Sequence, residues 1–392
     1  MRGRDEELRI ASEVLGCAER GQGRVLLIEG DPGIGKTGLL REIINEAGRR
    51  HFSVAEAEAD EIGRGTPFAP LLTALQDAVG GLSSETTSFS APESWAPMVG
   101  QLRALLERRA VTSPLLVSLD DLHYADPATL YALRHLTKQL ASHRLAWSLA
   151  RSTVLRRDHA SVLFDLLARE GATRVAVGPL DGEAIASTIA GLLGAVPDPG
   201  LRQLVAGAAG NPFLLSELIR GLQEEHGVLV DNGTAMLTAS QLPRRLRDAI
   251  GRWLGRLNQG TARMLETAAV LGREFRLDDV AQVLGETPVA MIPPVNEAIA
   301  AGIVLPGTDS FAFRHDLMRR AVAETIPAPT RQLLHRQAGE ILVARGSAKN
   351  AAAHLLKGAR HPYPAVMASL EAAATQLARS HPQAAADLLL RV

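Results

Sequence analysis

Cysteine and long apolar runs are scarce in this chain of 392 residues, and each shortage excludes a class of protein. The single cysteine, Cys17, excludes an internal disulfide framework and a cysteine-based zinc site, which favours a reducing compartment. No apolar run reaches the roughly 18 residues that a membrane-spanning helix needs. The stretch from Arg2 to Glu7 is charged and does not resemble a signal peptide. These absences predict a cytoplasmic protein with no membrane partner.

The chain also has no large excess of positive or negative charge, because 42 lysines and arginines nearly balance 43 aspartates and glutamates. A net charge of −1 produces no overall field that would gather nucleic acid or an anionic membrane. Lysine itself is rare and occurs only at Lys36, Lys138, Lys349 and Lys357. With 46% hydrophobic and 22% charged residues, the composition is that of a globular protein, and the length predicts about two to four domains.

A glycine-rich loop at residues 30–37, called the P-loop below, fits the pattern GxxxxGK[ST] between an expected strand and an expected helix. Without Cβ atoms at Gly33 and Gly35, successive backbone N–H groups can wrap a phosphate chain at a helix N-terminus. Lys36 is expected to reach the β- and γ-phosphates, and the Thr37 hydroxyl to ligate Mg²⁺. The loop therefore predicts a nucleotide site formed by Gly30, Pro32, Gly33, Ile34, Gly35, Lys36, Thr37 and Gly38.

A second nucleotide motif is the apolar run at 114–119 that ends in Asp120 and Asp121, the pattern known as Walker B. Its strand would bring Asp120 beside Thr37, where the carboxylate can hold the Mg²⁺ shell. Asp121 is expected to polarise the attacking water. Lys36 and Asp121 are therefore predicted to be catalytic, and Thr37 and Asp120 to bind the metal.

Apolar segments at 24–29, 52–57, 114–119, 145–150 and 173–177 alternate with helical patterns, including 70–79 and 98–109, with a polar loop at 80–97. This alternation predicts the α/β class with a doubly wound parallel sheet. Ligands of such sheets lie beyond the carboxyl ends of the strands, and Arg151 follows the fourth strand. Arg151 is therefore predicted to sense a γ-phosphate as a third catalytic residue. The alternative is a surface arginine that starts a loop.

The strand signal stops after residue 180, and short helices are expected at 183–193, 201–208 and 214–225 around the break at 210–213. Helices at 244–257, 261–271, 277–284 and 288–301 precede a hairpin at 302–313, which together indicate a winged helix. The remainder is rich in alanine and leucine and is typical of helical repeats. The predicted domains are a P-loop domain (1–178), a helical lid (179–240), a winged helix (241–327) and the start of TPR-like repeats (328–392).

Five motifs together resemble the STAND class of signalling ATPases, and within it the ATPase portion of the large LuxR-type (MalT-like) bacterial transcriptional regulators. They are Gly3-Arg4-Asp5, the P-loop, the run from Leu119 to Asp126, Gly210-Asn211-Pro212-Phe213, and Phe313-Arg314-His315-Asp316. The resemblance covers essentially the whole chain, which we expect to be a fragment of a longer regulator or an unusually short relative.

The resemblance implies further roles at the nucleotide. Arg4 would lie near the adenine, and Pro212 would pack a helical lid onto the nucleotide. His315 would contact the β-phosphate of bound ADP from the winged helix, although the family has methionine where this chain has Arg314. A helix-capping or buried structural histidine is the alternative for His315.

We expect an ATP- and ADP-dependent signalling switch with slow, Mg²⁺-dependent hydrolysis, closed with ADP and opened for self-association with ATP. An unknown inducer or protein would bind the C-terminal helices, and DNA would be bound only by a helix-turn-helix domain that these residues lack. The alternative is an AAA+ loader or remodeller that acts on DNA or protein, with an arginine finger among Arg144, Arg156 and Arg157. A small-molecule phosphotransferase is a weaker third reading.

Overall fold

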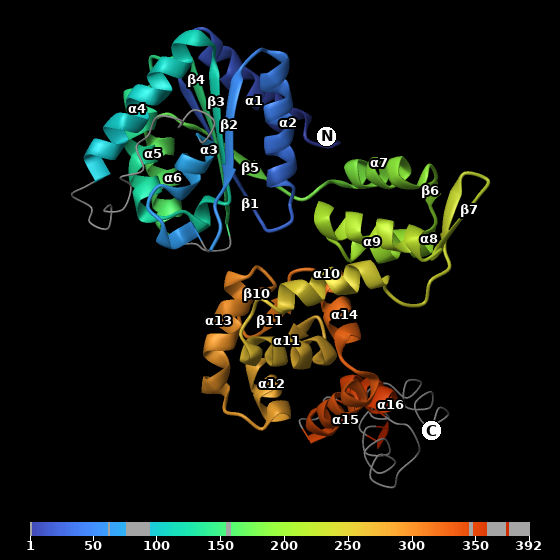
Figure 1. The fold of residues 1–392 in the computed structure, drawn as a ribbon. Helices are drawn as coiled ribbons and strands as arrows, with labels where there is room; N and C mark the ends of the chain where they lie inside the picture. The colour runs from blue at the N-terminus through green and yellow to red at the C-terminus, as the bar shows by residue number, and fades with distance from the viewer. Residues whose placement is uncertain are drawn as a thin grey trace. The chain divides into compact units, whose positions relative to one another are not determined.

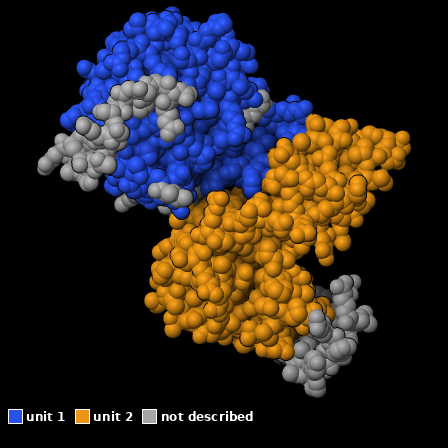
Figure 2. Space-filling model, viewed as in Figure 1, with its two compact units in different colours: residues 1–188, 211–213 blue, residues 189–210, 214–392 orange. Residues whose placement is uncertain are grey.

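The computed structural model describes residues 2–61, 63–75, 95–153, 158–344, 348–358 and 374–375. The chain divides into two compact units (Figure 2). The first unit consists of residues 1–188 and 211–213, and the second of residues 189–210 and 214–392. The three residues 211–213 thus pack with the first unit although the chain on either side of them belongs to the second.

The first unit is built on a five-stranded, fully parallel sheet of order β2-β3-β4-β1-β5. Apolar runs form these strands because both faces of a parallel sheet are covered by helices, and every residue of β3 and β4 is buried. The sheet confirms the predicted α/β class. Its strands are β1 (Arg24–Gly30), β2 (Ser53–Glu58), β3 (Leu115–Asp120), β4 (Leu145–Ser152) and β5 (Thr173–Val177).

Helices cover both faces of this sheet (Figure 1). Leu26 and Ile28 of β1 belong to the core beneath α1 and α2, whereas Leu27 between them belongs to the core beneath α3 to α6. Alternation of strand side chains between the two faces explains this division. The helices are α1 (Asp5–Glu19), α2 (Lys36–Arg49), α3 (Ala69–Ala74), α4 (Trp95–Thr112), α5 (Pro127–Gln139) and α6 (His159–Arg169), and α7 (Gly182–Leu193) follows β5 in the chain.

Helix α4 begins earlier than the sequence predicted, so the predicted loop up to residue 97 is wrong over its last residues. Trp95 lies 6.4 Å from Phe68 and 5.6 Å from Tyr131 between ring centroids, so tertiary packing holds the first turn. Pro97 is tolerated in this first turn because the N–H groups at the start of a helix lack helical partners in any case. The rest of that loop and the end of the predicted helix 70–79 lie outside the described residues.

The second unit contains a sheet that the sequence reading missed. Residues after 180 were expected to lack strands before the hairpin at 302–313, but β6 (Val196–Pro197), β8 (Thr234–Leu237) and β7 (Val228–Asp231) form a three-stranded sheet in that order. The two residues between β7 and β8 are Asn232 and Gly233, with φ of 46° and 75°. Asn-Gly flanked by apolar residues is the strongest short hairpin signal, because both positions of a type I′ turn need positive φ.

The rest of the second unit is mainly helical, with a three-stranded sheet of order β10-β11-β9. The hairpin expected at 302–313 is present and pairs Val304 with Phe313. The assignment of this region to a winged helix stays a prediction, as do the boundaries of the four predicted domains. The elements are α8 (Pro199–Ala206), α9 (Pro212–Glu224), α10 (Arg244–Leu254), α11 (Gln259–Leu271), β9 (Glu274–Phe275), α12 (Leu277–Leu284), α13 (Ile292–Ala300), β10 (Val304–Pro306), β11 (Phe311–Phe313), α14 (Asp316–Thr325), α15 (Ala328–Ala344) and α16 (Ala348–Gly358). Within the described residues, no helix combines the length and apolar character that crossing a bilayer requires.

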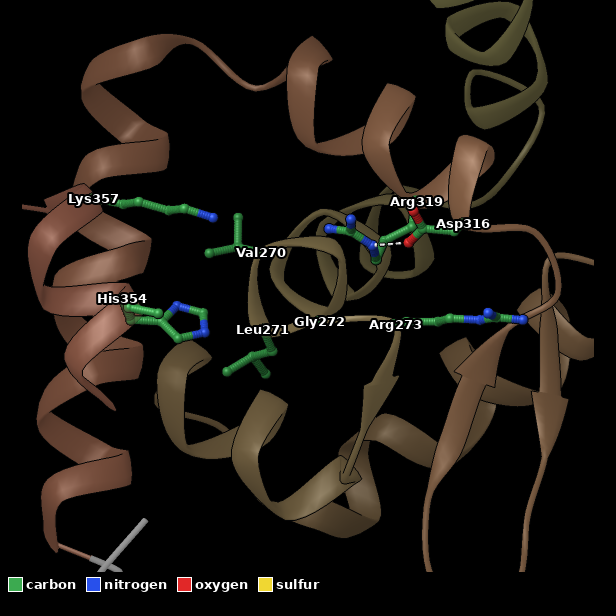
Figure 3. A pocket seen from close by; sticks show the side chains of 9 residues that line it. Val270, Leu271, Gly272, Arg273, Asp316, Arg319, His354 and Lys357 are labelled. Carbon is green, nitrogen blue, oxygen red and sulfur yellow. Dashed lines mark hydrogen bonds and ion pairs between the residues drawn. The ribbon is translucent and has the colours of Figure 1, made fainter. Parts of the chain in front are cut away.

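A cavity of ≈ 210 Å³ lies in the second unit where α14 and α16 meet the end of α11. Figure 3 shows His354 and Lys357 projecting from α16 toward Val270 and Leu271. Arg319 donates a hydrogen bond to the carbonyl oxygen of Ala269 (3.1 Å), and the Leu271 backbone accepts one from His354. These polar side chains therefore satisfy the exposed carbonyls at the C-terminus of α11, whose last turn has no basic residue of its own. The cavity contains none of the predicted site residues.

Two histidines join α15 to α16, with the Nδ1 atoms of His335 and His354 3.0 Å apart. Burial lowers the pKa of His335 from 6.5 to about 4, helped by the nearby His354, Lys357 and Arg331. Burial also lowers the pKa of His354, although its bond to the Leu271 backbone opposes the change. Both rings are therefore neutral partners of one N–H···N hydrogen bond near neutral pH.

We predict that the α15–α16 pair loosens as the pH falls from 6.5 toward 4. In this window the unfolded chain takes up a proton at His335 that the folded chain does not, so stability present above pH 6.5 is lost on acidification. Hydrogen exchange of residues 328–344, corrected for the intrinsic rate, should show the loss. The variant His335→Asn should weaken the dependence, with His354 left to contribute, and His51→Asn, at an exposed residue with φ of 61°, should leave it unchanged.

Candidate functional site

The P-loop connects the end of β1 to the first turn of α2 at the carboxyl edge of the sheet. Gly35 precedes α2 with φ of 102°, a conformation that side chains with a Cβ rarely adopt. Ile34 is buried and closes the loop against the core, whereas Gly33 and Thr37 are exposed. The loop thus presents glycine backbone and a threonine hydroxyl at the N-terminus of a helix, where an anion is favoured.

Lys36 is 6% exposed and folds back over its own loop. Its Nζ donates to the carbonyl oxygens of Gly30 (3.2 Å) and Asp31 (3.1 Å). Burial lowers the pKa of Lys36, while the charges of Asp121, Asp120 and Asp31 act in the opposite direction. The chain therefore holds a buried cation inside the loop, as binding of phosphate oxygens requires.

The structure brings together the two motifs that the sequence predicted to meet. The Thr37 hydroxyl donates to Oδ2 of Asp120 across 2.6 Å, and Oδ1 of Asp120 accepts from the N–H of Asp121 (2.8 Å). Hydroxyl and carboxylate oxygens are the ligands that Mg²⁺ prefers, so this pair fits the predicted metal. Among the described residues, no group of three or more His, Cys, Asp or Glu is placed to hold a metal ion by itself.

Asp121 lies just beyond β3 in a left-handed conformation with φ of 50°. Burial, followed by the charges of Asp120 and Glu58, raises the pKa of Asp121 to about 6, against the opposing effect of Lys36. A carboxylate with a raised pKa at this edge can accept a proton or orient a water. Its predicted catalytic role stays a prediction.

His123 links this segment to the end of β4. Its Nδ1 lies 3.4 Å from the N–H of Ser152 and 3.7 Å from Oδ1 of Asp121. Burial, and then the charge of Lys36, lowers the pKa of His123 to about 4, so the ring is neutral and can accept the Ser152 hydrogen bond. The sequence reading gave no role to His123, because nothing in the motif shows where its ring points.

Arg151 is buried at the end of β4 and paired with a carboxylate. Its Nε donates to Oε1 of Glu29 (2.7 Å), the residue beside it in the register of β1 and β4. Arg174 binds the other oxygen of Glu29, and the Arg151 guanidinium lies 5.3 Å from the ring centre of Phe164. The structure thus places Arg151 in a buried ion-pair network, and its proposed role toward a γ-phosphate stays a prediction.

Arg4 is also buried and contacts the backbone of the site. Its NH2 donates to the carbonyl oxygens of Ile34 (3.1 Å) and Gly178 (2.6 Å), and its NH1 donates to Glu7 (3.0 Å). The structure therefore shows Arg4 holding the P-loop to the chain that leaves β5. Its expected place near an adenine is untested.

Residues 211–213, which are distant from the P-loop in the sequence, also contact the loop. The side-chain amide of Asn211 donates to the carbonyl oxygen of Pro32 (3.0 Å), and the N–H of Phe213 lies 3.2 Å from the carbonyl oxygen of Gly33. Pro212, predicted to pack on a nucleotide, is half-buried at the first position of α9. Asn211 belongs to the motif recognised in the sequence, but its contact with the loop was missed.

His315 lies in the second unit, where it immediately precedes α14 and is 7% exposed. The N–H of Leu317 donates to the carbonyl oxygen of Gly207 (3.0 Å), so this turn packs against the end of α8. The predicted contact between His315 and a β-phosphate stays a prediction. In the first unit, by contrast, the predicted residues of the P-loop come together with Asp120 and Asp121. These loop residues are Gly30, Pro32, Gly33, Ile34, Gly35, Lys36, Thr37 and Gly38.

Comparison with known proteins agrees with the geometry of the first unit. Residues 1–148 match the family model described as an AAA ATPase domain. An uncharacterized protein of Rhizobium meliloti (strain 1021) is 23% identical over 393 residues, covering 85% of this chain and 36% of that protein. The chain therefore spans about a third of the length of this curated relative.

Solved structures that match the chain include an ORC2 protein and a STAND protein. The ORC2 protein of Aeropyrum pernix, solved as ADPNP–ADP complexes, has a TM-score of 0.52 at 15% identity over 87% of this chain and 95% of that one. A Signal Transduction ATPase with Numerous Domains (STAND) from Pyrococcus horikoshii has a TM-score of 0.34 at 14% identity over 96% and 52%. The ORC2 likeness shows a shared fold. The match of residues 1–148 to an AAA ATPase domain indicates nucleotide binding and hydrolysis.

We predict that Glu29→Gln destabilises the first unit by about 3–5 kcal/mol, because removing one partner of a buried ion pair leaves the other charge uncompensated. Arg151 would stay buried with only its longer ion pair to Asp158 (3.7 Å) left. Urea denaturation followed by tryptophan fluorescence would measure the change. Glu56→Gln, at an exposed position of β2, is the control and should change stability by less than about 0.5 kcal/mol.

Proposed function

We propose that this chain is an ATP- and ADP-dependent signalling switch, the regulatory ATPase module of a LuxR-type transcriptional regulator. In this proposal the ADP state is closed and the ATP state opens for self-association. Such a switch works only if the two nucleotides differ in their affinity for the two conformations. The proposal is supported by the AAA-type domain together with the motifs at 210–213 and 313–316.

The observation that carries the nucleotide function is the 2.6 Å contact between Thr37 and Asp120 beside the buried ammonium of Lys36. In our account Lys36 binds the β- and γ-phosphate oxygens, and Thr37 and Asp120 hold Mg²⁺, which would neutralise phosphate charge. Asp121 orients a water and takes its proton. The raised pKa of Asp121, about 6, suits a group that exchanges protons near neutral pH.

The curated relative is longer than this chain, which covers 36% of it, and our proposal treats the chain as one module of a longer regulator. An inducer or partner would then act on the helices from α15 onward, and DNA binding would need a helix-turn-helix domain. Self-association of the ATP state completes the proposal.

A working AAA+ ATPase that loads or remodels DNA or protein is the second candidate. It would need an arginine finger at an interface between copies. Arg144 is exposed, and its Nε donates to the carbonyl oxygen of Glu19 (3.3 Å), so its guanidinium lies at the surface. Arg156 and Arg157, the other fingers considered, lie outside the described residues. Fast turnover stimulated by DNA would favour this candidate.

We expect the purified protein to release ADP in about equimolar amount on denaturation, as a closed switch that retains its nucleotide would. Chromatography of the supernatant identifies and quantifies the nucleotide. Lys36→Ala should abolish retention, because the buried cation facing the phosphates is lost, whereas Lys138→Ala removes an exposed lysine of α5 and should retain it. An empty protein with rapid ATP turnover would contradict the switch and favour the second candidate.

We also expect Asp121→Asn to lower the rate of ATP hydrolysis by at least about 100-fold, because an amide cannot accept the proton of the water. ATP binding should persist, since Asp121 is not placed among the phosphate ligands. Single-turnover hydrolysis and equilibrium binding of a fluorescent ATP analogue separate the two effects. Asp309→Asn, at an exposed residue of the β10–β11 turn, is the control. Unchanged hydrolysis by Asp121→Asn would assign the proton transfer to another group.

A further inference from the structure

Two successive carbonyl groups of the P-loop are held by the residues that begin α9. Nδ2 of Asn211 donates to the carbonyl oxygen of Pro32 (3.0 Å), while its Oδ1 accepts from the N–H of Phe213 (3.1 Å). The same N–H lies 3.2 Å from the carbonyl oxygen of Gly33. One side chain, only 3% exposed, thus joins the loop to the first turn of the helix.

These contacts orient the part of the loop that would face phosphate. The C=O and N–H groups of a trans peptide unit point in opposite directions, so holding the Pro32 carbonyl also fixes the direction of the Gly33 N–H. Backbone N–H groups of such a loop are the donors that bind phosphate oxygens. Asn211 therefore acts on a phosphate-binding group without having to touch the nucleotide.

The packing between the two segments leaves no room for a larger residue at position 33. A Cβ on Gly33 would lie 3.0 Å from Oδ1 of Asn211 and 3.0 Å from Cβ of Phe213, and the φ of Gly33 is 72°. The glycine is thus required for the approach of Asn211 and Phe213 as well as for the turn itself. A shift of the loop backbone at this point would press directly on the start of α9.

The chain adopts an uncommon conformation to deliver Asn211. Ala209 and Gly210, immediately before it, both have positive φ, 47° and 74°. A left-handed alanine is unfavourable and persists only where surrounding contacts hold it. Residues 211–213 pack with the first unit, whereas Leu214, Leu215 and Leu218 of the same helix are buried and belong to the second unit. Helix α9 therefore begins on the P-loop and continues into the other unit.

We propose that Asn211 is a positioning residue of the nucleotide site and the link by which phosphate occupancy of the P-loop reaches α9. This proposal rests on the proposed nucleotide function. Phosphate binding sets the orientation of the Gly33 peptide, and Asn211 with the Phe213 N–H transmits that orientation to the first turn of α9. Loss of the link lets ADP leave faster and uncouples α9 from the nucleotide.

The test compares wild-type full chain with Asn211→Ala, Asn211→Ser and the control Asn296→Ala, which removes an exposed asparagine of α13. Asn211→Ser keeps an oxygen that can cap α9 but loses the amide donor to Pro32, so it separates the link from ordinary helix capping. Two readouts are used: the dissociation rate of a fluorescent ADP analogue, and hydrogen exchange of residues 212–224 with and without ADP. Circular dichroism confirms that each variant is folded.

We expect ADP to slow exchange at the start of α9 in wild type and in Asn296→Ala. In both Asn211 variants ADP should dissociate about tenfold faster, the loss of roughly one hydrogen bond, and should no longer change exchange in α9. Wild-type dissociation and ADP-dependent protection in both variants would overturn the proposal. The proposal would also be overturned if Asn211→Ser behaved like wild type in both measurements while Asn211→Ala did not, because Asn211 would then act only as a cap of α9. Failure of wild type itself to bind ADP would instead refute the proposed function, and the link with it.

Discussion

The ammonium group of Lys36 is buried at the carboxyl edge of the parallel sheet, and the rest of the site is arranged around that charge. A buried cation is costly unless carbonyls and carboxylates compensate it. Two loop carbonyls accept from it, and Asp31, Asp120 and Asp121 favour its charged form. Burial, and then the charge of Asp120, raises the pKa of Asp121, while Lys36 opposes the change. The buried Lys36 ammonium and the pKa of Asp121 therefore depend on the same group of neighbouring charges.

The backbone of the P-loop is held from two directions by residues distant in sequence. Arg4 binds the carbonyl oxygen of Ile34, and Asn211 binds that of Pro32. Loop peptides that must present N–H groups to phosphate gain from such fixing, because preorganised donors need not reorder when the ligand binds. Arg4 reaches the loop from the start of the chain and Asn211 from the start of α9. The loop is therefore a junction of three segments.

The sequence allowed a good prediction of the first unit, because its signals are local. Five apolar runs became the five strands, and the spacing of Lys36, Thr37 and Asp120 predicted their meeting. The β7–β8 hairpin was not predicted although Asn232-Gly233 signals it, so the sequence does contain the information for this hairpin. The early start of α4 was different in kind, because the contacts of Trp95 with Phe68 and Tyr131 appear only after folding.

The amino-acid sequence by itself determined the order of strands and helices, the glycine-rich loop and the acids that complete it, since periodicity and turn chemistry act within a few residues. The tertiary structure decided which groups pair across the sheet. Glu29 faces Arg151 only through the register of β1 and β4, and Asn211 meets Pro32 only after the chain returns from far along the sequence. Such contacts depend on how segments pack, and packing is a property of the whole unit rather than of any short stretch.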